Sequence, residues 1–372
     1  MMKIVLFTDV WVAGGISKYI SDITTKIDIN AFSCVVLTTQ VKTSMFLDEI
    51  EKNCGCVQVL SEKAYDDPIK RVISGLLSFE NAMKDIKPDV LHIHASNGTM
   101  FLYAYLAKKA GVKNVIVHSH NTDFGDGHRI IKRIGHEGGK YIFQKYADER
   151  IACSRMASEW LFTKKNQKNV KIIKCFVDTD RFQFNEMDRR IIRKMYDIDE
   201  STIIYLNVGR FNYQKNQLFL LDVFKKIIQK QEAYLFMIGE GELQEAILKK
   251  IKDNNIENRV IIVGTTPKVE QYMSAADIFI LPSLFEGNPI TSIEAQASGL
   301  ECFLSDTITN EAKIIDDLHY IDIRNVSGCA DSILNKPARK RNRLEYAGIV
   351  RRSGYDVELQ VDELARIYMA GI

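Results

Sequence analysis

The chain has 372 residues, of which 46% are hydrophobic and 26% charged, which suits a globular protein with two separate cores. Fifty Lys and Arg residues against 48 Asp and Glu residues give a net charge of +2, so no overall basic field indicates a nucleic-acid partner. No run of about 18 apolar residues predicts a membrane span, and the first apolar run is too short for a signal peptide. The seven cysteines are scattered, which favours reduced thiols in the cytoplasm.

Apolar runs of strand length alternate with helical patterns along the whole chain. The runs are continuous, so they predict strands that are buried on both faces, as in parallel sheets covered by helices. The first set comprises residues 4–7, 35–37, 90–94 and 115–120, and the second comprises residues 203–208, 234–238, 260–263 and 278–281. Two such sets predict an α/β protein with two Rossmann-like, doubly wound domains.

The join between the two sets falls near residues 174–182. We therefore expect domains over residues 1–180 and 181–354, followed by a helical pattern over about residues 355–372. Asp178-Thr179-Asp180 matches an Asp-x-Asp metal signature. Because it lies between the halves and does not follow a central strand, we interpret it as a structural segment.

Gly14 and Gly15 follow the first predicted strand and open a helix. Adjacent glycines let the backbone approach a phosphate or a sugar closely, and the start of a helix supplies N–H donors. A simple packing turn explains the pair equally well.

Four histidines stand at the ends of two predicted strands, as His92-Ile93-His94 and His118-Ser119-His120. Residues two apart on a strand share a face, so either pair could bind a metal ion or hold a proton. A metal-dependent hydrolase is therefore a rival class. Strand ends also carry histidines that bond to backbone, and we interpret His92 and His94 as structural.

Basic and apolar residues are mixed at helical spacing in residues 129–136 and 140–145. A solvated helix face explains this pattern, and so does a docking surface for anionic lipid and a lipid-linked acceptor, built on Arg129, Lys132, Arg133 and Lys140. Residues 336–343 form a second basic run with the same two readings.

Two cations follow the strand predicted at residues 203–208. Arg210 comes directly after Gly209, and Lys215 precedes the helical pattern of residues 218–228. Arginine offers a planar fork of donors and lysine a compact charge, a combination suited to a diphosphate. Both stand at the carboxyl end of a strand, where open α/β sheets bind ligands.

Two carboxylates flank the turn after the strand predicted at residues 278–281. Glu286 falls in the loop and Glu294 falls about one turn into the following helix. The backbone N–H groups of residues 288–291 would favour an anion such as phosphate. Alternatively, Glu294 only solvates or caps the helix.

Three motifs in this order resemble the retaining GT-B glycosyltransferases of family 4, and most closely those that build bacterial capsules and exopolysaccharides. The motifs are Gly209-Arg210 through Lys215-Asn216, Gly239-Glu240-Gly241-Glu242-Leu243 and Glu286-x7-Glu294. The resemblance covers nearly the whole chain. It implies an acceptor-binding domain and a nucleotide-sugar-binding domain that face each other across a cleft, with the C-terminal helix packed back on the first domain.

The resemblance also implies catalytic roles. Arg210 and Lys215 would hold the donor diphosphate, and Glu286 would contact the donor sugar. His120 would lie near the transferred sugar, with His118 as the alternative because the alignment can slip by two residues.

The implied donor site is wider than these residues. Glu294 would hold the nucleotide ribose. The donor-binding set is Gly14, Gly15, Arg210, Lys215, Gly287, Asn288, Pro289, Ile290 and Glu294.

From these patterns together with the resemblance we expect a cytoplasmic glycosyltransferase, peripheral at most to the inner face of the membrane, that uses no metal ion and no cofactor. It would move a hexose or N-acetylhexosamine from a nucleoside diphosphate sugar to a growing, lipid-linked surface glycan. We expect the donor to be a UDP-sugar. The alternatives are an inactive sugar-nucleotide-binding protein of the same fold and the hydrolase described above.

Overall fold

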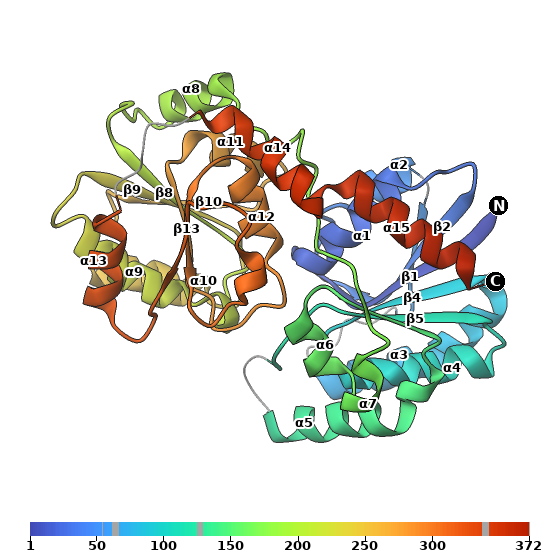
Figure 1. The fold of residues 1–372 in the computed structure, drawn as a ribbon. Helices are drawn as coiled ribbons and strands as arrows, with labels where there is room; N and C mark the ends of the chain where they lie inside the picture. Colours follow the sequence, from blue (N-terminus) through green and yellow to red (C-terminus); the bar gives the residue numbers. More distant parts are fainter. Residues whose placement is uncertain (54, 62–66, 125–128, 337–341, 372) are drawn as a thin grey trace. The chain divides into compact units, whose positions relative to one another are not determined.

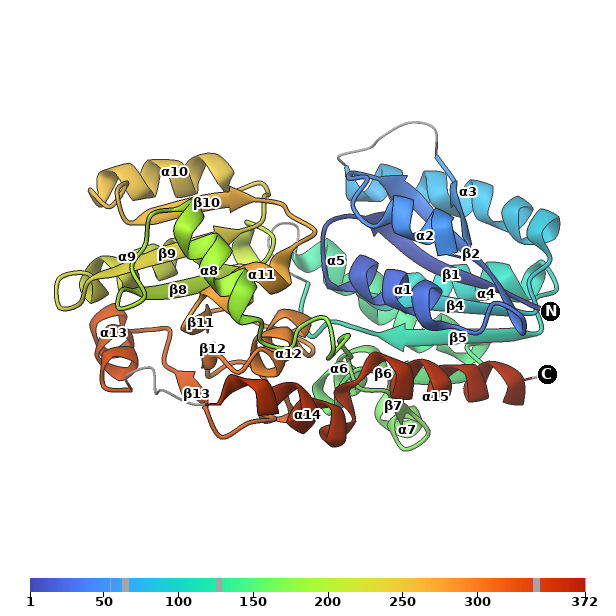
Figure 2. The same cartoon turned by 90° about the horizontal axis from the view of Figure 1, so that it is seen from above.

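The computed structural model describes residues 1–53, 55–61, 67–124, 129–336 and 342–371. The chain forms two compact units (Figures 1 and 2). Unit 1 comprises Met1–Phe176 and Val357–Ile372, and unit 2 comprises Val177–Asp356. The junctions expected from the sequence, after residues 180 and 354, lie a few residues from these divisions. In the described part of the chain, no helix combines the length and the apolar character that a membrane crossing needs.

Within the described residues, unit 1 contains a seven-stranded parallel sheet in the order β3-β2-β1-β4-β5-β6-β7. The strands are β1 Met2–Trp11, β2 Phe32–Val41, β3 Gly55–Val59, β4 Val90–Ala95, β5 Asn114–Ser119, β6 Glu149–Ala152 and β7 Lys171–Ile172. Strand β1 pairs with both β2 and β4 and is therefore central. Its residues Ile4, Val5, Leu6 and Phe7 are all fully buried, because helices cover both faces.

The helices of unit 1 lie on the two faces of this sheet. Helices α1, α2 and α15 cover one face, and α3 and α4 pack together on the other (Figure 1). The helices are α1 Gly15–Lys26, α2 Leu47–Asn53, α3 Pro68–Ile86, α4 Phe101–Lys109, α5 Arg129–Gly138, α6 Arg155–Leu161, α7 Lys164–Gln167 and α15 Val357–Ala370, with short turns η1 Gly98–Met100, η2 Gly139–Phe143 and η3 Gln144–Tyr146. The C-terminal helix α15 thus belongs to unit 1 and contacts α1.

Unit 2 repeats the same design with a six-stranded parallel sheet in its described residues, in the order β10-β9-β8-β11-β12-β13. The strands are β8 Ile203–Val208, β9 Ala233–Ile238, β10 Val260–Gly264, β11 Ile278–Leu281, β12 Glu301–Ser305 and β13 Leu318–Ile321. Strand order reverses between β8 and β11. This is the point where open α/β sheets form ligand sites at the strands' carboxyl ends.

Helices again cover both faces of the sheet in unit 2. Helices α9 and α13 pack together on one face, and α8 and α11 on the other (Figure 1). The helices are α8 Glu186–Met195, α9 Gln217–Ile227, α10 Gln244–Asp253, α11 Val269–Ala275, α12 Ile290–Ala297, α13 Val326–Leu334 and α14 Tyr346–Val350, with short turns η4 Tyr213–Lys215, η5 Asn310–Ala312, η6 Arg343–Glu345 and η7 Arg351–Tyr355.

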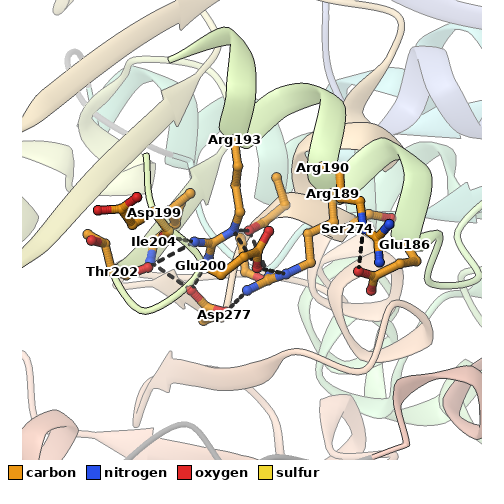
Figure 3. Close-up of polar contacts among 12 residues, drawn as sticks. Glu186, Arg189, Arg190, Arg193, Asp199, Glu200, Thr202, Ile204, Ser274 and Asp277 are labelled. Carbon is orange, nitrogen blue, oxygen red and sulfur yellow. Dashed lines mark hydrogen bonds and ion pairs between the residues drawn. The ribbon is translucent and has the colours of Figure 1, made fainter. Parts of the chain in front are cut away.

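A buried arginine ties α8 to the amino ends of β8 and β11 (Figure 3). The guanidinium of Arg193 donates to Asp277 Oδ2 at 2.6 Å, to Asp199 O at 2.7 Å and to Thr202 O at 3.0 Å. Asp277 in turn accepts from the backbone N–H of Ile204 at 2.8 Å. This hydrogen-bond network holds the amino ends of the two central strands β8 and β11 together, at the end of the sheet opposite to their carboxyl ends.

The eight strands predicted from the sequence are all present, and the prediction of two doubly wound α/β domains is confirmed. Strand β5 ends at Ser119, so His120 lies just past it instead of inside it. The sequence missed β3, β6 and β7 in unit 1 and β12 and β13 in unit 2.

Five cysteines are buried, at Cys34, Cys153, Cys175, Cys302 and Cys329, whereas Cys56 is exposed. The prediction for Cys54 lies outside the described residues.

Candidate functional site

Lys215 is positioned by the turn that follows β8. Asn212 caps the short η4 turn, with its Oδ1 accepting from the backbone N–H of Lys215 at 3.0 Å. Asn216 then adopts the left-handed backbone region, at φ 56°, where asparagine is tolerated, and the chain enters α9. The stem of Lys215 passes over Gly209, where an added Cβ would come within 3.1 Å of Lys215 Cε.

The loop between β11 and α12 is bonded directly to this turn. The backbone carbonyl of Gln214 accepts from the N–H of Leu284 at 2.8 Å, and Gln214 Nε2 donates to the carbonyl of Phe285 at 2.9 Å. Asn216 Nδ2 donates to the carbonyl of Pro282 at 3.1 Å. The carboxyl ends of β8 and β11 therefore carry one continuous polar rim.

Lys215 and Glu286 meet at the centre of this rim. Lys215 Nζ lies 2.7 Å from Glu286 Oε1, and Gln214 Nε2 lies 3.3 Å from Glu286 Oε2. The two charged side chains are only 15% and 9% exposed. The ammonium group of Lys215 can bind a phosphate and the carboxylate of Glu286 can accept from hydroxyls, so a ligand that carries both groups could replace either member of the pair.

The glycine motif after β9 supports the rim from the side. Phe211 N–H donates to the Glu240 carbonyl at 2.9 Å, and Leu243 N–H donates to the Phe211 carbonyl at 3.0 Å. A Cβ on Gly239 would lie 2.1 Å from the Gly209 carbonyl oxygen, and Gly239 also has φ 141°. Only glycine allows the two backbones to approach this closely.

Arg210 stands apart from Lys215. Its guanidinium pairs with Glu242 at 2.9 Å, and the two side chains are 37% and 54% exposed. Of the predicted catalytic residues, the structure thus brings Lys215 and Glu286 into contact. Arg210 lies on the same loop as Lys215 but forms a surface ion pair with Glu242. An exposed pair such as this exchanges easily, because it contributes little free energy.

The start of α12 presents further polar atoms. Gly287, Asn288 and Pro289 lie in the loop, and α12 begins at Ile290. Glu294 is buried on the next turn.

Three buried side-chain atoms of the same region have no hydrogen-bond partner among the described residues: Ser283 Oγ, Asn288 Oδ1 and Thr291 Oγ1. Buried polar atoms are normally hydrogen-bonded, so this cluster favours a polar ligand at the start of α12.

In unit 1, Gly14 precedes α1 with an extended backbone. A Cβ at Gly14 would meet only Val12 Cγ2, at the ordinary contact distance of 3.7 Å. Internal packing therefore does not require glycine at this position, which is compatible with close approach of a ligand.

The four histidines gather on one face of the unit 1 sheet. His92, His94 and His118 are fully buried, whereas His120 is partly exposed beyond the end of β5. Burial lowers the pKa of His92 and of His120 to about 3, so both are neutral at pH 7. The structure therefore offers His120 and not His118 to solvent.

His92, His94 and His118 each have a ring nitrogen within 4.8 Å of the others, and they could hold a metal ion. Zinc–nitrogen bonds of about 2.0–2.1 Å bring tetrahedral ligands to within roughly 3.4 Å of one another. A hydrolytic metal also needs an open position for water and substrate. Because these three histidines are fully buried, their position disfavours the hydrolase alternative.

The predicted basic surface of residues 129–145 is only partly formed by exposed charges. Lys140 turns inward and donates to the carbonyl of Trp160 at 2.7 Å, and burial lowers its pKa. Arg129 pairs with Asp123 at 2.9 Å. Arg133 is exposed as expected. The apolar residues beside these charges are the exposed Ile130, Ile131, Ile134, Tyr141 and Ile142.

The second basic run, residues 336–343, lies largely outside the described residues. Arg343 at its end is structural, because its guanidinium donates to the carbonyls of Ser298, Ala276 and Met273, each at 2.8 Å.

The Asp-x-Asp segment serves packing inside unit 2. Asp180 pairs with Arg351 at 2.6 Å, and Asp178 Oδ1 accepts from the backbone N–H of Arg181 at 3.1 Å. Thr179 between them donates to Asp356 Oδ2 at 2.5 Å. The two aspartates have separate structural partners, which supports the structural interpretation of this segment.

The sequence reasoning missed Gln214, Ser283 and Thr291. Gln214 precedes Lys215 directly, so its place in the turn was a usable signal. Ser283 and Thr291 carried no signal, because the lack of a partner for a side-chain oxygen cannot be seen in the sequence.

Comparison with known proteins yields two family matches. Residues 13–181 match the family described as Glycosyltransferase Family 4, and residues 188–348 match Glycosyl transferases group 1.

Three relatives illustrate the range of similarity. The putative glycosyltransferase EpsF of Bacillus subtilis is 28% identical over 297 residues, which cover 77% of each chain. An Escherichia coli enzyme named UDP-Gal:alpha-D-GlcNAc-diphosphoundecaprenol alpha-1,3-galactosyltransferase is 24% identical over 80% of this chain and 79% of its own. The capsular polysaccharide biosynthesis glycosyltransferase CapH of Staphylococcus aureus is 22% identical over 91% of each chain.

Solved structures show the same fold. Anabaena HepE in complex with UDP and glucose superposes with a TM-score of 0.80 at 13% identity, covering all of both chains. WaaG, a glycosyltransferase of lipopolysaccharide biosynthesis, superposes with a TM-score of 0.73 at 13% identity, over 98% of this chain and 99% of its own. The Glycosyltransferase Family 4 match covers the first half of the chain and the Glycosyl transferases group 1 match covers the second. Each half is a doubly wound parallel sheet, and the chain is a glycosyltransferase of the GT-B fold.

Proposed function

We propose that this glycosyltransferase moves a hexose or N-acetylhexosamine from a UDP-sugar to a lipid-linked surface polysaccharide under construction, with retention of the anomeric configuration. The observation that carries the proposal is the buried Lys215–Glu286 pair beside the polar start of α12. The names of the relatives from Escherichia coli and Staphylococcus aureus support the donor, the lipid diphosphate and the polysaccharide product. Retention rests on the family resemblance.

The proposed chemistry is mainly electrostatic. The diphosphate gains charge as its bond to the sugar breaks, and Lys215 together with the N–H groups at the start of α12 would stabilise that charge. Glu286 would exchange its hydrogen bond from Lys215 for sugar hydroxyls. The leaving phosphate oxygen would accept the acceptor's proton, so the reaction needs no protein nucleophile.

Two residues complete the proposed donor site. Glu294, buried on α12, would accept the ribose hydroxyls. Arg210 would leave Glu242 and pair with the diphosphate, an exchange that costs little because the Arg210–Glu242 pair is exposed.

In unit 1, Gly14 and Gly15 would contact the donor phosphates, and His120 would lie near the transferred sugar. We propose further that α5 docks on an anionic membrane that carries the lipid-linked acceptor. Ile130 and Ile134 are 78% and 69% exposed, beside the basic Arg129, Lys132 and Arg133. The helix itself is held firmly, because the backbone N–H of Gly98 donates to His136 Nδ1 at 3.0 Å. An amphipathic helix of this kind binds interfaces through its apolar side chains and its charges together.

The docking proposal is tested by reversing Arg129, Lys132 and Arg133 to Glu. Each basic residue near an anionic surface is worth about 1 kcal/mol, so partitioning onto vesicles of phosphatidylglycerol should fall more than about 100-fold. The control reverses three exposed lysines of unit 2, Lys226, Lys249 and Lys252, which changes the net charge equally. Equal loss in both triple variants, or no loss in either, would remove α5 as the docking surface.

The donor proposal is tested by thermal unfolding with a panel of sugar nucleotides. A UDP-sugar at 100 times its dissociation constant should stabilise the protein by about 2.7 kcal/mol. The stabilisation should fall to about 0.4–1.4 kcal/mol in Glu294→Gln, whose affinity is expected to be about 10- to 100-fold lower, and should persist in full in Glu245→Gln, an exposed residue of α10. Stabilisation by ADP- or GDP-sugars alone would overturn the UDP part of the proposal, and no stabilisation by any donor would overturn the site.

A further inference from the structure

The four histidines form two hydrogen-bonded imidazole pairs that stack on each other. His92 Nε2 lies 3.2 Å from His118 Nδ1, and His94 Nδ1 lies 3.0 Å from His120 Nε2. The rings within each pair are inclined by only 2° and 29°. His92 lies over His94 with centroids 4.2 Å apart, and His118 lies over His120 at 4.0 Å, with the rings tilted by 31° and 32°. We call this arrangement the histidine stack.

The parallel register of β4 and β5 produces the stack. His94 lies directly opposite His118, while His92 is one pleat earlier and His120 one pleat later. All four side chains therefore point to one face, and the hydrogen bonds run diagonally between the strands. Tyr368 of α15 closes the inner pair, with its Oη 2.7 Å from His92 Nδ1.

The environment allows little rearrangement of the rings. Tyr19 of α1 places its ring edge-on to His94, His118 and His120, with centroids 5.0–5.7 Å away. Burial lowers the pKa of all four histidines, so each ring carries a single proton and is both a donor and an acceptor. The proton on one ring therefore decides the tautomer of its partner.

The direction of the His94–His120 hydrogen bond follows from the other nitrogen of His94. His94 Nε2 is buried and has no hydrogen-bond partner among the described residues. A buried N–H without an acceptor is rarer in proteins than a buried acceptor without a donor. The proton of His94 is therefore on Nδ1 and is donated to His120 Nε2. His120 must then carry its own proton on Nδ1.

We propose that His94 is a positioning residue, which holds His120 in one orientation and in the Nδ1–H tautomer so that this N–H is donated to an oxygen of the transferred sugar or of the acceptor. This inference rests on the proposed role of His120. It makes His120 a hydrogen-bond donor and not a general base. The inner pair, anchored on Tyr368, supports the ring stack from the C-terminal helix.

The first test is the tautomer itself, which needs no activity. The full-length protein is labelled with ¹⁵N-histidine, and long-range ¹H–¹⁵N correlation spectra assign the protonated nitrogen of each ring. We expect the proton of His120 on Nδ1 in the wild type. His94→Phe keeps the stacked ring but removes the donor, so the proton should redistribute to Nε2 of His120. His94→Asn places an amide N–H where Nδ1 was and should preserve the wild-type tautomer. A wild-type His120 protonated on Nε2 overturns the proposal.

The second test separates this inference from the function on which it rests. Misplacing a catalytic contact by about 1 Å can lower turnover by 10²-fold. We expect kcat to fall 10- to 100-fold in His94→Phe with the donor KM unchanged, and to recover to within about threefold of the wild type in His94→Asn. Wild-type kcat in His120→Ala would overturn the proposed role of His120. Impaired His120→Ala together with a wild-type rate and tautomer in His94→Phe would overturn only the positioning role. Thermal unfolding identifies any variant that fails to fold. If a variant fails, the tautomer of His120 in the wild-type spectrum tests the proposal without it.

Discussion

Glu286→Gln should tighten the binding of UDP while it slows sugar transfer. The structure places Glu286 Oε1 2.7 Å from Lys215 Nζ, with both side chains largely buried. At that distance and an effective dielectric constant of about 20, the Coulomb attraction is on the order of 6 kcal/mol before desolvation is counted. The diphosphate must therefore share the ammonium group with a strong internal competitor. Glutamine keeps the shape and an oxygen acceptor but removes the competing charge.

The expected magnitude is the net value of one charge-assisted hydrogen bond, about 1.5 kcal/mol, or roughly tenfold tighter UDP binding. Lys215→Met should weaken UDP binding by about 1.5–3 kcal/mol. In the double variant the gain from Glu286→Gln should vanish, because no ammonium group remains to be released. Transfer should fall at least about tenfold in Glu286→Gln, because the contact with the sugar is lost.

Calorimetric titration of UDP into the wild type, the two single variants and the double variant measures these four affinities at one pH and one salt concentration. A loss of UDP affinity in Glu286→Gln would show that Glu286 holds the nucleotide and does not restrain Lys215. Wild-type affinity in Lys215→Met would remove Lys215 from the donor site. Lys249→Met, an exposed change on α10, serves as the matched control.

Three further predictions concern the scaffold and the metal question. Arg193→Met leaves Asp277 without its partner and should lower the free energy of unfolding by about 3–5 kcal/mol. Arg190→Met breaks only an exposed pair with Glu186 on the same helix (Figure 3) and should change this free energy by less than about 0.5 kcal/mol. Urea unfolding measures both values, and equal effects would contradict the structural role of the Arg193–Asp277 pair. The pKa of His92 is about 3 in the folded protein and 6.5 when the imidazole is fully solvated, so the unfolded chain binds the extra proton and stability is lost as pH falls from 6.5 towards 3. Urea unfolding at pH 7.5 and 5.0 should show about 2 kcal/mol of this loss for His92, and His92→Phe should lack that share; an equal pH dependence in both proteins would contradict it. Transferase activity should survive EDTA, because the proposed chemistry uses only protein groups, and a loss restored by zinc or manganese would contradict it.

The fold could be predicted because its signal is local. Continuous apolar runs such as residues 203–208 reveal parallel strands wherever helices cover both faces. Strands β12 and β13 escaped because they carry polar residues inside the sheet. Glu301 of β12 is buried and pairs with His319 of β13 at 2.5 Å, so each strand looks polar until the other is beside it.

The site could be predicted only as a set of residues and not as a set of contacts. Lys215 and Glu286 are 71 residues apart, and their contact depends on the reversal of strand order between β8 and β11. Arg210 and Glu242 were both in predicted motifs, yet nothing local showed that they pair. The histidine stack likewise needs the register of β4 against β5, which no single strand contains.

For helix α5 and the turn that follows it, the sequence pattern did not show which basic residues are exposed. Residues 129–145 alternate basic and apolar types, and the pattern gave no means to separate Arg133, which is exposed, from Lys140, which binds the carbonyl of Trp160. That difference depends on where α6 ends and is set by packing within unit 1.

The central claim is that a donor site in unit 2, built on Lys215, Glu286 and Glu294, serves sugar transfer. The most direct measurement follows radiolabel from a UDP-sugar into lipid-linked glycan with the wild type, Glu294→Gln and Glu245→Gln, each shown to be folded by thermal unfolding. We expect transfer by the wild type and by Glu245→Gln. In Glu294→Gln we expect a loss of about 10- to 100-fold at subsaturating donor, because a charged hydrogen bond to the nucleotide is worth about 1.5–3 kcal/mol. Equal transfer by all three proteins, or transfer by none, would contradict it.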